Sequence, residues 1–169
     1  GFNSLAKNTT GNGNTAIGDR VLANNLTGAQ NTGVGQWSLL NNTGNDNTSV
    51  GFYSMATNIT GSKNVAIGAF SLLQNTFGYE NISIGYSSMD NNKIGFKNLA
   101  IGYFSSYYNV SGSGNVALGH TALLYNQSGS NNVAIGQNAG REEKGNNNFI
   151  YIQVILYLIL LLIKKEVVH

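Results

Sequence analysis

The chain repeats itself about every 17 residues, and this periodicity constrains its fold more than any other feature of the sequence. One set of glycines, here called the phase glycines, recurs in steps of 17 residues with a single step of 16: Gly1, Gly18, Gly35, Gly51, Gly68, Gly85, Gly102, Gly119 and Gly136. A second set, the turn glycines, precedes the phase glycines by seven residues: Gly11, Gly28, Gly44, Gly61, Gly78, Gly95, Gly112 and Gly129. A unit this short cannot bury its own apolar side, so successive units are expected to stack into a solenoid.

Asparagine recurs in two columns of the same repeat. Four residues before each phase glycine stand Asn14, Asn31, Asn47, Asn64, Asn81, Asn98, Asn115 and Asn132. Three residues before each turn glycine stand Asn8, Asn25, Asn41, Asn58, Asn75, Asn92, Asn109 and Asn126. Stacked asparagines can form amide ladders along a solenoid. The sequence therefore predicts that the hydrogen bonds of many polar groups are satisfied by uncharged amide side chains.

Two apolar columns are the predicted core. The residue before the phase glycine is always aliphatic: Ile17, Val34, Val50, Ile67, Ile84, Ile101, Leu118 and Ile135. Four residues after the phase glycine stand Leu5, Leu22, Leu39, Met55, Leu72, Met89 and Leu123, with Ser106 as the exception. Each well-buried aliphatic side chain contributes roughly 1.5–3 kcal/mol to folding.

The segment Asn-x-Ala-Ile-Gly alternates with period two, which predicts a short strand. The residue before the aliphatic one is always small and is expected on the opposite, outer face: Ala16, Gly33, Ser49, Ala66, Ser83, Ala100, Ala117 and Ala134. A small outer column indicates a closely packed neighbouring subunit. The alternative is a flat exposed face without selection for size.

The Asn-x-x-Gly stretch predicts a turn in which the turn glycine supplies a positive φ angle. The single 16-residue step lies between Gly35 and Gly51, and the missing residue is expected before the turn, since Gly35 and Gly44 are nine residues apart. A helical fold is excluded because two glycines and several asparagines in each unit would cost several kcal/mol in helix propensity.

Composition argues against an enzyme, a cofactor or a metal site. Charged residues make up 9% of the 169 residues, the net charge is +2, and there is no cysteine. A calcium-binding roll needs an acidic residue in each turn, and residues 1–140 hold four: Asp19, Asp46, Glu80 and Asp90. His120 occupies a variable surface position, Glu142 and Glu143 lie in a charged loop, and the small charge gives no reason to expect nucleic acid.

The repeat resembles the head repeats of YadA-like trimeric autotransporter adhesins and the related repeats of phage and giant-virus tail-fibre proteins. The segments 64–68 (NVAIG) and 132–136 (NVAIG) carry the resemblance, together with the longer unit 8–18, and it extends over residues 1 to about 140. It implies an all-β, left-handed parallel β-roll, assembled as a homotrimer on a surface-attached stalk. The 17-residue unit is a few residues longer than that of the adhesin heads, so both the adhesin and the viral version stay open.

The two ends differ from the repeat. Gly1 is in phase with it, without an initiating Met or a signal peptide, so we expect a fragment of a longer chain. Residues 1–148 form the predicted β-roll of about eight coils and a partial ninth, and residues 149–169 form a hydrophobic tail. Three interpretations of the tail remain open: a short membrane anchor over residues 149–163, a hydrophobic cap or trimerisation helix, or an out-of-frame end.

The sequence as a whole predicts a non-enzymatic fibre or adhesin segment, outside the cell on an outer membrane or on a virion, with itself and an unnamed surface receptor as partners. A β-solenoid that binds ice or another crystalline surface is the alternative. Aromatic residues, which either cover the coils or bind a ligand, gather after the phase glycines and in the turns: Trp37, Phe52, Tyr53, Phe70, Tyr86, Tyr103, Phe104, Tyr107, Tyr108 and Tyr125.

Overall fold

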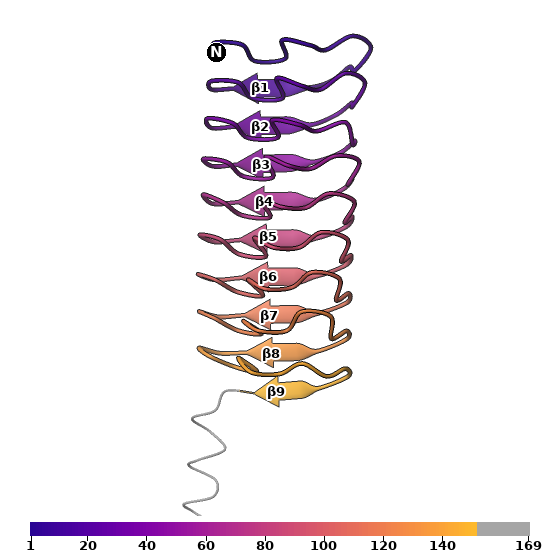
Figure 1. Cartoon of the computed structure of the whole chain (residues 1–169). Coiled ribbons are helices and arrows are strands. Elements are labelled where there is room, and N and C mark those ends of the chain that lie inside the picture. The colour runs from indigo at the N-terminus through magenta and orange to yellow at the C-terminus, as the bar shows by residue number, and fades with distance from the viewer. Residues whose placement is uncertain (152–169) are drawn as a thin grey trace, which may run out of the picture.

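The chain folds into a parallel β-solenoid, as the repeat predicts. A computed structural model describes residues 1–151, and within them it contains one nine-stranded sheet and no helix. Figure 1 shows the coils stacked along a single axis, with one labelled strand in each coil from β1 to β9. The strands are β1 (Thr15–Ile17), β2 (Thr32–Val34), β3 (Thr48–Val50), β4 (Val65–Ile67), β5 (Ile82–Ile84), β6 (Leu99–Ile101), β7 (Val116–Leu118), β8 (Val133–Ile135) and β9 (Phe149–Tyr151).

Equivalent residues lie side by side in neighbouring coils. Ile67 pairs with Ile84 and Ile84 with Ile101, so the strand register advances by one whole repeat each time. Backbone hydrogen bonds also join the coils outside the sheet, as from Leu72 N to Ser88 O at 2.9 Å and from Glu80 N to Ser62 O at 3.1 Å. The predicted stacking is therefore confirmed, and it extends around the whole coil.

The faces of the strands are the reverse of the prediction. The aliphatic column lies outside the core, and Ile17, Ile67 and Ile101 are 59%, 39% and 39% exposed. Its other members are partly exposed: Val34, Val50, Ile84, Leu118 and Ile135. The small column, expected at a subunit interface, faces the interior: Ala16 is partly buried against the core, and Gly33, Ser49, Ala66, Ser83, Ala100, Ala117 and Ala134 are buried.

The interior is narrow, and this explains the reversal. We call the third to seventh residues after each phase glycine the rear run, because they pack against the inner side of the sheet. The second predicted core column belongs to this run and is confirmed: Leu22, Leu39, Met55, Leu72, Met89 and Leu123 are fully buried, and Leu5 packs against them at the first coil. These side chains fill the coil, so only a small residue fits opposite them on the strand. Ser38 and Ser49 illustrate the close approach, with their Oγ atoms 2.9 Å apart.

The asparagines form two ladders. In the strand ladder the backbone N–H of each asparagine donates to Oδ1 of the preceding one at 2.9–3.1 Å: Asn14, Asn31, Asn47, Asn64, Asn81, Asn98, Asn115, Asn132 and Asn148. In the turn ladder each Nδ2 donates to the carbonyl of its own turn glycine at 2.8–3.2 Å: Asn8, Asn25, Asn42, Asn58, Asn75, Asn92, Asn109 and Asn126. A strand-ladder amide of the preceding coil reaches the same carbonyl, as from Asn64 Nδ2 to Gly78 O at 2.9 Å.

The short coil departs from the predicted alignment. Asn42, not Asn41, takes the place in the turn ladder, because Asn42 is buried and donates to Gly44 while Asn41 is exposed. The missing residue therefore lies inside the turn rather than before it. Successive turn-ladder asparagines are also linked by Nδ2-to-Oδ1 bonds, as from Asn75 to Asn58 at 2.7 Å. These links are missing between Asn25 and Asn42 and between Asn109 and Asn126, and among the described residues the Oδ1 atoms of Asn25 and Asn109 have no hydrogen-bond partner.

The turn glycines are needed for space and not for a positive φ. None of the eight turn glycines has a positive φ; the phase glycines from Gly18 to Gly136 have φ between 112° and 140°. A methyl group at Gly78 would lie 2.2 Å from Asn75 Oδ1 and 2.5 Å from the carbonyl oxygen of Gly95. The prediction of a turn is confirmed, but its physical reason is the close stacking of successive coils.

The predicted C-terminal tail begins within the solenoid. Phe149 to Tyr151 form β9, which pairs with β8 in the same register. Regular stacking thus continues three residues beyond the predicted boundary at 148. The remaining residues, 152–169, lie outside the described part of the chain, and the three interpretations of the tail stay open.

Candidate functional site

The outward side of the sheet is a continuous, uncharged strip, here called the outer face. It is formed by the first and third residues of strands β1 to β8 and by Phe149, the first residue of β9, because the middle residue of each strand points inward. Strands β4 to β8 contribute only Val, Ile and Leu at these positions, whereas β1, β2 and β3 each begin with threonine. Nine strands about 4.8 Å apart make this strip about 40 Å long. An exposed apolar strip of this length is typical of an interaction surface.

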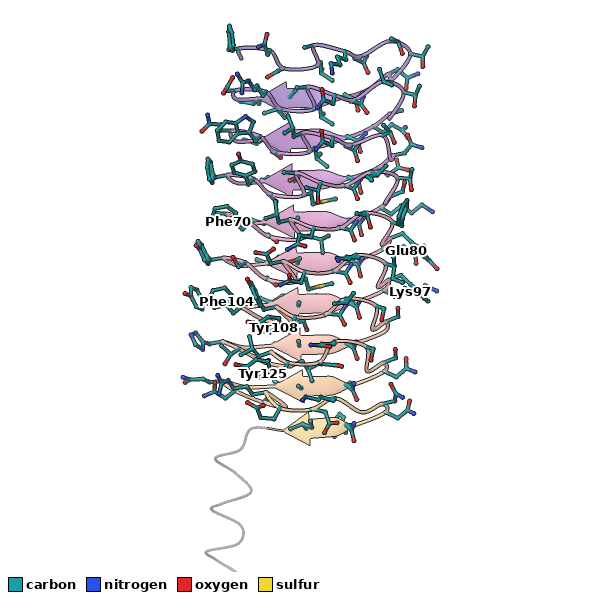
Figure 2. The ribbon with its side chains drawn as sticks, viewed as in Figure 1. Phe70, Glu80, Lys97, Phe104, Tyr108 and Tyr125 are labelled. Carbon is teal, nitrogen blue, oxygen red and sulfur yellow. The ribbon has the colours of Figure 1, made fainter. Side chains whose placement is uncertain are left out.

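The aromatic residues gather at one edge of the rod. The ten aromatic residues noted after the phase glycines and in the turns form one network of ring contacts, from Trp37 through Tyr86 and Tyr103 to Tyr125. His120 stacks on Tyr103 with ring centroids 5.2 Å apart, and the Arg141 guanidinium lies 5.3 Å from the centre of the Tyr125 ring. Figure 2 shows Phe70 and Phe104 at this edge, opposite Glu80 and Lys97.

The opposite edge holds a smaller group that the sequence analysis missed. Tyr79 and Phe96 stack with centroids 4.9 Å apart and an interplanar angle of 3°. Beside them Lys97 Nζ lies 4.0 Å from Glu80 Oε2. Both pairs have the 17-residue spacing, so a search for aromatic or opposite charges one repeat apart would have found them. Both charged side chains are well exposed, and such pairs contribute about 0–1 kcal/mol.

A buried carboxyl group interrupts the aromatic edge. Asp90 is 7% exposed, and burial raises the pKa of its carboxyl group, while hydrogen bonds from the side chains of Gln74 and Ser87 oppose the rise. Burial also raises the pKa of Tyr107, and the charge of Asp90 adds to that effect. The repeat pattern does not single out Asp90, since its column holds Leu73 and Tyr107 in the adjacent coils.

We expect the Asp90→Asn substitution to stabilise the chain at pH 7. Because the folded chain holds the Asp90 proton more tightly than the unfolded chain, the free energy of unfolding is highest below the ordinary pKa of about 3.9 and falls as pH rises through the folded value. Asparagine cannot ionise, so in the variant the free energy of unfolding does not fall in this way as pH rises. Thermal unfolding should show a rise of a few degrees at pH 7, since roughly 1 kcal/mol corresponds to about 2–4 °C, and almost none at pH 3. The exposed Asp46→Asn variant is the control, and an equal shift in both variants would contradict the assignment.

The other polar residues considered from the sequence do not converge. His120 is exposed, Glu142 pairs with Arg141 at 3.6 Å, and Glu143 Oε1 accepts hydrogen bonds from the backbone of Lys144 and Gly145. Over residues 1–151 no group of three or more His, Cys, Asp or Glu side chains could hold a metal ion. In the same range no helix is long and apolar enough to cross a bilayer.

Comparisons with family models, with characterised proteins and with solved structures gave no match. The function is therefore argued from the two surfaces described above, the outer face and the aromatic edge.

Proposed function

We propose that the chain is a non-enzymatic rod segment of an attachment fibre or adhesin, displayed outside the cell or on a virion. The outer face is the observation that carries this proposal. It runs the length of the described rod, its strands pair in the same register from coil to coil, and it bears no charge. These properties suit assembly into a longer structure better than recognition of a small molecule.

The partner proposed for the outer face is the chain itself, in a homotrimer. A partner for this strip must present an apolar surface of equal length, and a second copy aligned coil by coil does so. Three copies related by a three-fold axis would cover all three outer faces. A heterologous contact that closes into a ring leaves no copy of the contact surface exposed. The small column predicted for this contact is buried within each chain, so the aliphatic column takes its place in the proposal.

Light scattering tests the assembly. The unaltered chain is expected at three times its single-chain mass of 18.0 kDa. The double substitution Ile67→Lys and Ile101→Lys should give the single-chain mass, because charged side chains on the outer face oppose burial, and the circular dichroism spectrum should be unchanged. Ile59→Lys with Ile94→Lys is the matched control, since these isoleucines are 43% and 52% exposed but lie outside the strands. A stable monomer of the unaltered chain would contradict the trimer.

Ice binding is the second candidate, and it would use the regularly spaced strands of the outer face. A regular array of threonine would favour it, but only β1, β2 and β3 begin with threonine. A thermal-hysteresis measurement separates the two functions, and activity in that assay would favour ice binding.

A further inference from the structure

We propose that a groove along the rear of the rod binds a linear, uncharged glycan; this inference rests on the attachment role proposed above and names its ligand class. Two hollows, of about 440 and 390 Å³, adjoin at Leu40 and follow successive coils. Together they form what we call the rear groove. It lies on the rear run, away from the outer face, so assembly through that face leaves it open.

The two walls of the rear groove differ in chemistry. One wall carries the rings of Trp37, Tyr53 and Phe70, and the other carries polar side chains. Tyr53 and Phe70 are stacked with centroids 6.1 Å apart and an interplanar angle of 13°, and Trp37 lies 4.5 Å from Tyr53. The floor is formed by small and aliphatic residues: Ala6, Ala23, Leu40, Ala56 and Leu73.

The polar wall is a row of side chains that bond from coil to coil and leave one amide acceptor and one amide donor free. Asn24 Nδ2 donates to Asn41 Oδ1 at 2.7 Å, one coil further along, and Gln74 Nε2 donates to Asn91 Oδ1 at 3.0 Å. Asn24 Oδ1 and Asn41 Nδ2 have no partner among the described residues, so one acceptor and one donor are free. Sugar hydroxyls both donate and accept, and the apolar faces of pyranose rings stack on aromatic rings. A polyproline peptide also fits aromatic-lined grooves, but its backbone offers only acceptors.

The rings are not required by the fold. Trp37, Tyr53 and Phe70 stand two residues after a phase glycine, where other coils carry Asn3, Arg20, Ser87, Phe104, Thr121 and Asn138. Every residue in this column has a left-handed backbone, with φ of 60°, 55° and 58° at the three rings. This conformation costs about 1–2 kcal/mol for most residues and favours asparagine. Because the fold accepts asparagine in this column, the bulky rings are not needed by the backbone and are available to the surface.

Charge narrows the ligand class further. The hollow from Leu40 to Gln74 is lined without a charged residue, and Lys7 and Arg20 lie only at the N-terminal end of the groove. We therefore infer a neutral glycan, extended along the rod axis so that successive sugars meet successive coils. Each contact would be weak, and repetition along the chain and among copies would add avidity.

Fluorescence of Trp37 provides the test, because it is the single tryptophan of the chain and lines the groove. Titration of the full chain with cellohexaose or chitohexaose is expected to give a saturable change. The double substitution Tyr53→Asn and Phe70→Asn should weaken binding at least tenfold without loss of folding, since Asn3 and Asn138 occupy the same column. Phe104→Asn, in that column but outside both hollows, is the matched control and should bind as the unaltered chain does.

Three outcomes would overturn the proposal: no saturable response to either glycan, equal binding by the double variant, or a response only to a polyproline peptide. Light scattering of the same samples separates this proposal from the previous one. A single-chain mass with intact glycan binding would remove the trimer and leave the groove, whereas a trimer without glycan binding would do the reverse.

Discussion

Replacing Asn75 with aspartate is expected to lower the free energy of unfolding by about 3–5 kcal/mol at pH 7, as for a charge left unpaired in a protein interior. Asn75 is fully buried in the turn ladder. Its Nδ2 donates to Asn58 Oδ1 at 2.7 Å and to Gly78 O at 2.9 Å, and its Oδ1 accepts from Asn92 Nδ2 at 2.8 Å. Aspartate has the same shape but lacks both donors, so its carboxylate would face two oxygens.

The Asn75→Asp defect should shrink at low pH. Burial against two oxygens favours the protonated acid in the folded variant, which restores one donor, so the deficit is largest above the raised pKa and declines towards pH 3. Urea unfolding at pH 7 and pH 3 measures both values. Asn45→Asp is the matched control, because the exposed Asn45 uses its Oδ1 as an acceptor for Ala29 N at 2.8 Å and aspartate keeps that role. Equal losses in the two variants would show that the ladder does not contribute as described.

Replacing Gly78 with alanine is the second change with a large expected effect, a loss of about 3 kcal/mol, at the upper end of the range for overpacking. The added methyl group would meet Asn75 Oδ1 and the Gly95 carbonyl oxygen, and the carbonyl belongs to the backbone of the next coil. The clash can be relieved only by separating the two coils locally, which weakens the amide ladder and the backbone hydrogen bonds together.

Two further variants identify the cause. Gly145 continues the turn-glycine column, and among residues 1–151 a methyl group there would meet the partly exposed Glu143 carboxylate at 2.9 Å and Asn148 Nδ2 at 3.3 Å. Gly145→Ala should therefore change the free energy of unfolding by less than about 0.5 kcal/mol, as at ordinary surface sites. Gly78→Asn places a larger side chain in the same space, and because Gly78 has no positive φ, the loss expected from this variant is steric. Thermal unfolding that tolerated Gly78→Asn would contradict the steric explanation.

The repeat predicted the solenoid, the strands, the amide ladders and the buried leucine column, because each of these follows from residues that recur at one spacing. It did not predict which face of the strand is buried. Ala66 and Ile67 alternate as a strand requires, and hydrophobicity alone favours Ile67 inside. The decision depends on the distance between the strand and the rear run, which Leu72 has already filled. That distance is a property of the folded coil and cannot be predicted from the 17-residue repeat.

The short coil shows the same limit at a finer scale. Asn41 and Asn42 are adjacent, and counting back from Gly44 selects the wrong one. The correct residue is identified by the buried contact of Asn42 with the Gly44 carbonyl. The rear groove was also invisible in the sequence, since it combines aromatic and amide residues that only the coil geometry places on facing walls.

The two gaps in the turn ladder have a mechanical consequence. Tension along the rod is carried from coil to coil by the bonds between neighbours, so the joint with the fewest bonds sets the strength of the whole. Asn25 and Asn109 lack a turn-ladder partner in the next coil, so each of these two joints has one amide bond fewer in the turn. At the turns, load would separate the coils more easily at these joints than in the segment between them, which contains the middle of the sheet.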